Sequence, residues 1–363
     1  MSRRILFLNW RDPLNPNSGG SELYAFEIAK RLALDGFLVT YLTSSFKGSL
    51  HKEILYNVHI VRMGNSLTLY PRAFFWMKEH NTEYDVIIEI INGFPFMVRF
   101  TKLESKHLTI IFHLPSFIAT CKKLLVIGPF EFIISRAMLK LFYLNTTVIT
   151  DGESSKSELI SMHFSTVHVI EDGLESVSLG LVEFHKENLV VISGPLKPWK
   201  KIDHGILAFS ALPNNWKLII IGRGNKRYLH YLMNMIKKNN LSSRVELAGY
   251  VSLKEKINLY TRSKINIVTS DKEGFSLTAL ESARYGSVCI GYNNVGVRDA
   301  VINGKTGLLV ERNNIDELKK ALFGLATDNE LWKTMSKNCI AFSRNFTWDK
   351  TYLQFLEVLK DIT

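Results

Sequence analysis

Two glutamates eight positions apart form the clearest chemical pattern in this sequence, because Glu273 and Glu281 bracket a glycine turn and an apolar run. Residues 264–270 before this stretch are rich in β-branched side chains and predict a buried strand. Residues 277–285 predict a helix, which Gly286 would end. Glu273 is therefore expected in a strand-to-helix loop, where a carboxylate can meet a ligand.

The backbone of this loop is expected to bind anions. Gly274, Phe275 and Ser276 lead into the predicted helix. The N–H groups at the start of a helix lack acceptors within it, and the helix dipole favours negative charge there, so phosphate oxygens bind at such places. Glu281 falls about two turns into the helix, where a carboxylate can accept hydrogen bonds from sugar hydroxyls. The plainer alternative is a solvated loop glutamate and an ordinary surface helix glutamate.

Three candidate residues in the first half also follow predicted strands. Gly19 and Gly20 lie in a loop between the strand 5–10 and a helix, without the GxGxxG pattern of dinucleotide-binding folds. Paired glycines let a ligand approach the backbone, although a plain turn is the simpler interpretation. His113 follows the apolar strand 108–112, and ligands bind at the carboxyl ends of strands in open parallel sheets. A lone histidine is more often structural.

Four basic residues follow predicted strands in the second half of the chain. They are Lys197, Lys200, Lys201 and Arg223. The net charge is +11, and most of the excess lies in residues 174–363. Such an excess can serve phosphate groups, an anionic membrane surface or nucleic acid, although a solvated face is the plainer explanation.

The composition indicates a globular protein, with 46% hydrophobic and 22% charged residues. Three separated cysteines without a CxxC pair, and the absence of a DxD motif, predict no disulfide framework and no metal site. No uncharged run reaches the length of a membrane span, and the N-terminus is expected to be a strand and not a signal peptide. Residues 117–144 mix apolar and basic side chains, which favours either core packing or a helix lying on a membrane.

The stretch from Glu273 to Glu281 resembles the E-x7-E motif of retaining glycosyltransferases with the GT-B fold, the GT4-like glycosyl transferases group 1. Residues 291–299 and 303–310 resemble the family's segment after that motif. The resemblance implies that Glu273 contacts the donor sugar and that Glu281 binds the ribose. It also implies that the loop amides of Gly274, Phe275, Ser276 and Leu277 hold the diphosphate.

The resemblance extends to the other positions singled out above. The family has a similar glycine loop at Gly19 and Gly20, lining the site near donor and acceptor, and a histidine at the place of His113 that faces the reacting sugar. The family pattern Gly-Arg-Leu…Lys-Gly puts Lys200 on the lysine that binds the donor diphosphate. The resemblance therefore implies catalytic roles for His113, Glu273 and Lys200.

One position departs from the family. Pro195 stands where the family has the arginine that binds the diphosphate. Proline carries no charge, so we expect Lys197, Lys201 or Arg223 to replace the missing cation. If none does, the protein is slow or inactive.

The fold implied is α/β, GT-B, with two Rossmann-like doubly wound domains facing across a cleft. The expected boundaries are an acceptor-side domain at 1–174, a linker at 175–188, a nucleotide-sugar domain at 189–345 and a final helix at 346–363 that crosses back to the first domain.

The activity implied is transfer of a hexose, with retention, from a nucleotide-diphosphate sugar such as UDP- or GDP-hexose to a glycan or lipid-linked acceptor. No cofactor, metal or nucleic acid is expected. The expected place is the cytoplasm, including the membrane face. The alternative is a non-catalytic GT-B partner subunit of another glycosyltransferase, favoured by Pro195. The E-x7-E motif disfavours an epimerase, the lack of a cofactor-lysine signature disfavours a phosphorylase, and only the charge favours a nucleic-acid binder.

Overall fold

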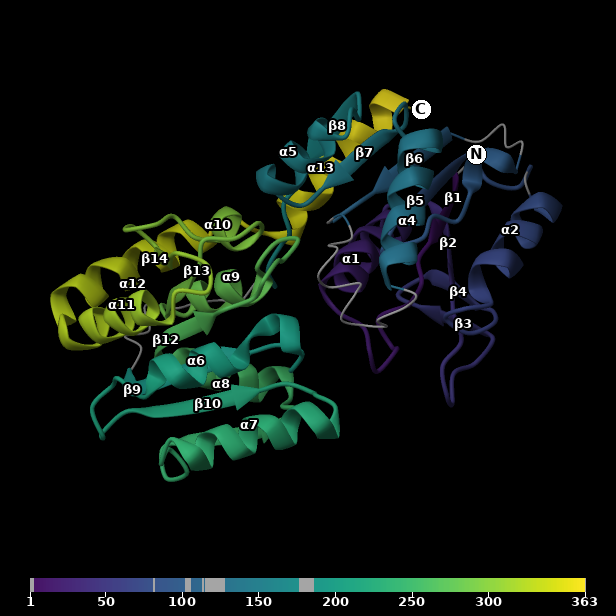
Figure 1. The fold of residues 1–363 in the computed structure, drawn as a ribbon. Helices are drawn as coiled ribbons and strands as arrows, with labels where there is room; N and C mark the ends of the chain where they lie inside the picture. Colours follow the sequence, from purple (N-terminus) through teal and green to yellow (C-terminus); the bar gives the residue numbers. More distant parts are fainter. Residues whose placement is uncertain are drawn as a thin grey trace. The chain divides into compact units, whose positions relative to one another are not determined.

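The computed structural model describes residues 3–80, 82–101, 106–112, 114, 128–175 and 186–362. His113, Cys121 and most of the expected linker lie outside these residues. The chain forms two compact units (Figure 1). Unit 1 contains Met1–Glu175 together with Thr347–Thr363, and unit 2 contains Ser176–Phe346.

Unit 1 is built on one eight-stranded sheet in the order β3-β4-β2-β1-β5-β6-β7-β8. Among the strand pairs of the described residues, only β3 with β4 is antiparallel. The strands are β1 Arg4–Leu8, β2 Leu38–Thr43, β3 Lys52–Leu55, β4 Val58–Arg62, β5 Val86–Ile90, β6 Lys106–Ile110, β7 Thr147–Thr150 and β8 Thr166–Val169. The central strands β1 and β5 are mostly apolar and buried, as expected for parallel strands that are covered on both faces, although β5 also carries the buried Glu89.

The helices of unit 1 include one from the far end of the chain. They are α1 Gly20–Leu34, α2 Leu69–Glu79, α4 Gly128–Phe142, α5 Glu153–Ser161 and α13 Trp348–Ile362. The last helix packs against α1 and β6, and Tyr352 donates a hydrogen bond of 2.6 Å to Asp35. A side chain at Gly173 would collide with the backbone of Trp348, since its Cβ would lie 2.4 Å from the Trp348 nitrogen. The final helix therefore belongs to the first unit.

Unit 2 has a six-stranded parallel sheet in the order β11-β10-β9-β12-β13-β14. The strands are β9 Glu187–Ser193, β10 Lys217–Ile221, β11 Val245–Gly249, β12 Ser263–Val268, β13 Val288–Tyr292 and β14 Gly307–Val310. The helices are α6 Ile202–Phe209, α7 Lys226–Lys238, α8 Leu253–Arg262, α9 Leu277–Arg284, α10 Val297–Ala300, α11 Ile315–Thr327 and α12 Asn329–Ser343. Alternate residues of β9 enter different cores: Val190 packs with α6 and α7, and Val191 packs with α8. Both faces of the sheet are therefore covered.

Each sheet reverses its strand order at one place. In unit 1 the chain moves outward from β1 through β2 and later returns to place β5 on the other side of β1. In unit 2 it moves outward from β9 through β10 and β11, then returns to place β12 on the other side of β9. Loops that leave neighbouring strands in opposite directions open a crevice at the carboxyl edge, where ligands bind in doubly wound folds. The two expected sites are thus the edges after β1/β5 and after β9/β12.

Among the described residues, no helix combines the length and apolar character that crossing a membrane requires. The stretch 117–144 is described only from residue 128 on, as helix α4. Leu139 of α4 is buried, whereas Ile133 and Leu141 are 61% and 73% exposed. The described part of this stretch therefore has both a core face and an exposed apolar face.

Candidate active site

The loops that leave β9 and β12 meet at the reversal of strand order in unit 2. After β9 the chain passes through Gly194 and a short 3-10 helix, Pro198–Lys200. After β12 it runs through Thr269 to the start of α9. The hydroxyl of Thr269 donates hydrogen bonds to the carbonyl oxygens of Lys200, at 3.0 Å, and of Lys201, at 2.8 Å. These bonds join the two loops, which brings the lysines of one beside the carboxylates of the other.

The predicted residues Lys200 and Glu273 form an ion pair. Lys200 Nζ lies 2.5 Å from Glu273 Oε1, and the two side chains are 18% and 15% exposed. Ser270 donates its hydroxyl proton to the same carboxylate oxygen. The Glu273 N–H donates to Val295 O at 3.2 Å. The carboxylate is thus held in place from both loops, while part of it still faces solvent.

The amides of the loop after Glu273 differ in availability. The Ser276 N–H donates to Gly296 O at 3.1 Å, and the Leu277 N–H donates to Phe275 O at 3.0 Å. Among the described residues, none accepts from the N–H groups of Gly274 and Phe275. The Ser276 hydroxyl is buried, and it too has no partner within the described chain. Two of the four expected amides are therefore open in this structure, together with one hydroxyl that the prediction missed.

The loop after β13 supports this arrangement. Asn294 donates a side-chain hydrogen bond to the carbonyl of Ser270. Gly296 has a φ of +80°, and a Cβ there would lie 2.5 Å from the Gly274 carbonyl oxygen. Only glycine permits this close approach. Ser270 and Asn294 were not among the predicted site residues, although both are polar residues directly after buried strands, which is the available signal.

The neighbouring lysine Lys201 is engaged elsewhere. Its ammonium lies 2.8 Å from Asp271 Oδ1 and also donates to the side chain of Asn313. Lys201 itself has a left-handed backbone, with φ +46°, at the start of α6. Lys197 is half-buried, and the described residues include no ion-pair partner for it. Of the three predicted lysines, Lys200 alone contacts Glu273.

Pro195 and Arg223 lie on adjacent loops after β9 and β10. The N–H of Leu196 donates to Arg223 O at 2.8 Å. Gly222 is packed so tightly against this loop that a Cβ would lie 1.8 Å from Gly194 O. The Arg223 guanidinium lies 4.1 Å from the centre of the Tyr250 ring, and Pro195 is exposed. The structure therefore places a cation one loop away from the proline.

Glu281 is paired on the neighbouring helix. Lys256 of α8 lies 2.7 Å from Glu281 Oε1, and the two side chains are 27% and 22% exposed. Beside them the buried Tyr260 hydroxyl hydrogen-bonds Ser193 at 2.5 Å. Burial, and after it the charge of Glu281, raises the pKa of Tyr260 well above its usual value, so this phenol is neutral. Lys256 was missed because nothing in its local sequence marks which helix would lie beside α9.

Gly19 and Gly20 lie in unit 1, at the exposed start of α1. The Gly19 N–H donates to Glu22 Oε2 at 2.7 Å, and Trp10 Nε1 donates to the other oxygen of Glu22 at 2.5 Å. The φ of Gly19 is −142°, which any residue adopts. The glycine is therefore not required by backbone conformation, and the buried Glu22 organises this edge of the sheet.

Comparison with known proteins decides the family of the second unit. Residues 180–342 match the family model of Glycosyl transferases group 1. This stretch of the chain belongs to that family. The group 1 domain thus contains the Lys200–Glu273 pair, the loop that follows it and the Lys256–Glu281 pair.

Two curated relatives of the group 1 domain carry glycosyltransferase names. An uncharacterized glycosyltransferase of Methanocaldococcus jannaschii is 32% identical over 48% of this chain and 49% of its own length. The poly(glycerol-phosphate) alpha-glucosyltransferase of Bacillus subtilis is 27% identical over 55% of this chain and 30% of its own length. The matched stretch therefore spans about half of these relatives or less.

Solved structures match nearly the whole chain. The sucrose-phosphate synthase of Thermosynechococcus elongatus superposes with a TM-score of 0.84 over 99% of this chain and 98% of its own, at 18% identity. HepE of Anabaena, solved in complex with UDP and glucose, has a TM-score of 0.79 at 18% identity over 99% of this chain and all of its own. These likenesses confirm the predicted GT-B fold with two Rossmann-like domains.

Proposed function

We propose that this protein is a retaining glycosyltransferase, which moves a hexose from a nucleotide-diphosphate sugar to a hydroxyl of a glycan or lipid-linked acceptor. The observation that carries the proposal is the ion pair of Lys200 with Glu273 beside the open amides of Gly274 and Phe275, within the group 1 domain. Such a site offers a cation and N–H donors for phosphate oxygens, and a carboxylate for sugar hydroxyls.

The site must stabilise the negative charge of the leaving diphosphate. Negative charge builds up on its oxygens as the glycosidic bond breaks, and preorganised donors stabilise that charge. Lys200 and the N–H groups of Gly274 and Phe275 take this role, with the buried Ser276 hydroxyl as a further donor. The Leu277 N–H joins them only if it leaves the carbonyl of Phe275. Lys197, Lys201 and Arg223 supply the surrounding positive field.

Glu273 and Glu281 bind the two sugars of the donor in this proposal. Glu273 accepts hydrogen bonds from the hexose, and Glu281 accepts them from the ribose. The ion pairs that both carboxylates form with lysines keep their charges compensated when no donor is bound. A leaving phosphate oxygen assists deprotonation of the acceptor hydroxyl, and His113 and the Gly19–Gly20 loop contact the reacting sugar. In this scheme the lysines balance the charge of the diphosphate and the amide N–H groups donate hydrogen bonds to it, so no step is assigned to a metal.

The ligand of a similar solved structure suggests the donor, and the exposed residues of α4 suggest the place of action. HepE was solved with UDP and glucose and with UDP-glucose, which favours UDP-hexoses as the first donors to test. GDP-hexoses are the second choice. We place the activity in the cytoplasm at the membrane face, because the exposed Ile133 and Leu141 of α4 flank the cation of Lys140.

A donor panel with a matched pair of lysine variants tests the proposal. Wild type, Lys200→Met and Lys333→Met are incubated with UDP-, GDP- and ADP-hexoses, and released nucleotide is measured. Lys333 serves as the control because it also pairs with a glutamate, at 2.8 Å, but on the exposed face of α12. We expect turnover by wild type and Lys333→Met, and a loss of about 100-fold or more in Lys200→Met with an unchanged melting temperature. Equal turnover by the two variants would refute the role of Lys200.

The second candidate is a non-catalytic partner subunit, which Pro195 favours. An exposed proline replaces the expected arginine, and no charge at that position can meet the diphosphate. This candidate predicts weak nucleotide binding and no turnover with any donor. Heat protection by UDP or GDP would support it if no donor of the panel released nucleotide, even with glycan and lipid-linked acceptors present.

A further inference from the structure

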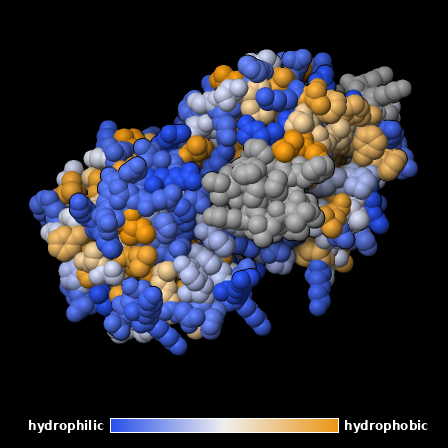
Figure 2. Space-filling model, viewed as in Figure 1, coloured by the Kyte–Doolittle hydropathy of each residue, from blue (hydrophilic) through white to orange (hydrophobic). Residues whose placement is uncertain are grey.

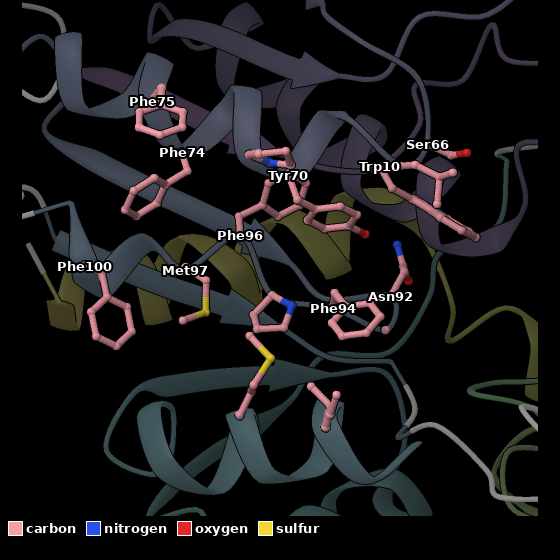
Figure 3. A pocket seen from close by; sticks show the side chains of 16 residues that line it. Trp10, Ser66, Tyr70, Phe74, Phe75, Asn92, Phe94, Phe96, Met97 and Phe100 are labelled. Carbon is pink, nitrogen blue, oxygen red and sulfur yellow. The ribbon is translucent and has the colours of Figure 1, made fainter. Parts of the chain in front are cut away.

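A large apolar cavity lies in unit 1, apart from the residues assigned above. Its volume is about 990 Å³. Most of its lining side chains come from two helices and one connecting segment: Tyr70 and Phe74 from α2, Phe94 and Met97 from the segment after β5, and Ile134 from α4. Figure 3 shows the aromatic rings of Tyr70, Phe94 and Phe96 turned toward this space. Ligand sites are typically concave and mostly apolar with a few polar groups, so the cavity has the character of a binding site.

The cavity begins at the reversal of strand order in unit 1. Trp10 follows β1 and Asn92 follows β5, and both line the space. In Figure 3 these two residues and Ser66 lie at one end of the cavity, and Phe75 and Phe100 lie at the other. The polar residues are therefore gathered at the sheet edge where ligands of doubly wound folds bind.

Hydrogen bonds connect the polar end of the cavity to the start of α1. Asn92 donates to Asn9 Oδ1 at 3.1 Å, and Trp10 donates to Glu22, which also accepts from the Gly19 N–H. The Arg11 guanidinium lies 3.9 Å from the centre of the Trp10 ring. A cation thus stands beside the polar end of an otherwise apolar cavity.

The far end of the cavity opens onto exposed apolar side chains. Phe75 and Phe100 line this end and are 63% and 43% exposed. Figure 2 shows apolar atoms gathered on the face of unit 1 that carries α2 and α4. Exposed apolar surface that continues into a cavity marks a place where an apolar ligand enters.

We infer that this cavity holds the hydrocarbon chain of a lipid-linked acceptor. The chain lies between α2 and α4, and the phosphate that joins it to the glycan lies at the polar end, near Arg11. A free sugar acceptor is a poor fit, since most of the lining side chains are apolar and few polar groups remain, namely those of Trp10, Ser66, Tyr70 and Asn92. This inference rests on the function proposed above, and it selects the lipid-linked acceptor over a soluble glycan.

Two neighbouring isoleucines provide a matched test. Ile134 lines the cavity, whereas Ile133 on the same helix is 61% exposed and does not line it. Binding of farnesyl phosphate, a short isoprenoid phosphate used below its micelle concentration, is measured by calorimetry in the full chain. We expect saturable binding by wild type and Ile133→Trp, and affinity about tenfold weaker or lost in Ile134→Trp, because the indole fills the cavity.

A second pair covers the case in which Ile134→Trp does not fold. Phe75→Ser removes an exposed lining residue, and Leu141→Ser removes an exposed residue of α4 that is not part of the lining. Weaker binding in Phe75→Ser alone supports the inference. Equal binding by both members of each folded pair, or no saturable binding by wild type, overturns it, and so does equal binding of inorganic phosphate.

Heat protection by UDP, measured on the same proteins, separates this inference from the proposed function. If UDP protects the protein and farnesyl phosphate does not bind, the lipid inference fails and the donor site stands. If farnesyl phosphate binds and neither UDP nor GDP protects the protein, the proposed function fails and the cavity is a lipid site of another kind.

Discussion

Lys200 and Glu273 are 73 positions apart in the sequence, and their charged atoms lie 2.5 Å apart in the structure. The contact exists because β9 and β12 are neighbours in the sheet although two strands separate them along the chain. Under the proposed function, a diphosphate at this site would compete with Glu273 for Lys200. We therefore expect donor binding to be coupled to the freedom of the Glu273 carboxylate.

Glu273→Gln keeps the shape of the side chain and removes its charge. We expect turnover to fall about 100-fold, because the carboxylate no longer orients the donor sugar and no longer holds Lys200. Glu330→Gln, which breaks an exposed pair on α12, is the control. Released nucleotide is measured for both variants at saturating donor. Activity of Glu273→Gln within about threefold of wild type would remove Glu273 from the reaction.

Gly296→Ala tests whether the loop after β13 supports the loop that follows Glu273. Both Gly296 and Gly304 have positive φ, at +80° and +75°, but only at Gly296 would a Cβ meet neighbouring backbone. Gly304→Ala is expected to cost about 1 kcal/mol from backbone strain alone. Gly296→Ala should cost about 2–3 kcal/mol or more, because the Gly274 carbonyl must also move.

Urea unfolding of the two glycine variants measures this difference. Where Gly296→Ala still folds, its protection by UDP should be weaker than that of Gly304→Ala. Identical stability and identical protection would mean that the loop after β13 does not position Gly274.

Pro195→Arg is expected to increase activity. The new guanidinium would stand at the position of the family's diphosphate-binding arginine, and Pro195 is exposed, so the fold tolerates the change. One added charge-assisted hydrogen bond corresponds to a gain of about tenfold in kcat/KM. If Arg223 already compensates, Arg223→Ala lowers kcat/KM in wild type and has a smaller effect in Pro195→Arg. Additive effects of the two substitutions would show that these residues do not share a role.

His204 is expected to make the group 1 domain less stable in acid. Burial lowers the pKa of His204, and nearby Lys201 acts in the same direction against Asp203 and Asp271. The unfolded chain therefore takes up a proton at a pH where the folded chain does not. The contribution to stability is complete above the unfolded value near 6.5 and is lost as the pH falls through the window below it.

Melting temperatures at pH 7.5 and pH 5.5 test the role of His204. His204→Gln keeps a hydrogen-bonding group near the Tyr292 hydroxyl, which lies 2.6 Å from His204 Nδ1. The drop in melting temperature between the two pH values should be smaller in the variant than in wild type. A drop of equal size would show that other groups govern the acid sensitivity.

Local patterns predicted the elements around the site. The β-branched run before Glu273 is strand β12, and the apolar run after it is helix α9, which begins at Leu277 as expected. These predictions hold because the period of apolar residues and the position of glycine act over a few residues. The spacing of the two glutamates also placed them correctly on a loop and on the following helix, since that spacing is a property of one segment.

Long-range contacts were decided only by the tertiary structure. The pairing of Glu281 with Lys256 depends on the packing of α8 against α9. The hydrogen bond that the Ser276 N–H donates to the Gly296 carbonyl depends on a loop after another strand, β13. The cavity between α2 and α4 is likewise formed by segments far apart in the chain. Sequence alone determined which residues stand at strand ends. Strand order determined which of those ends meet, because side chains from different strands come within reach only at neighbouring positions in the sheet.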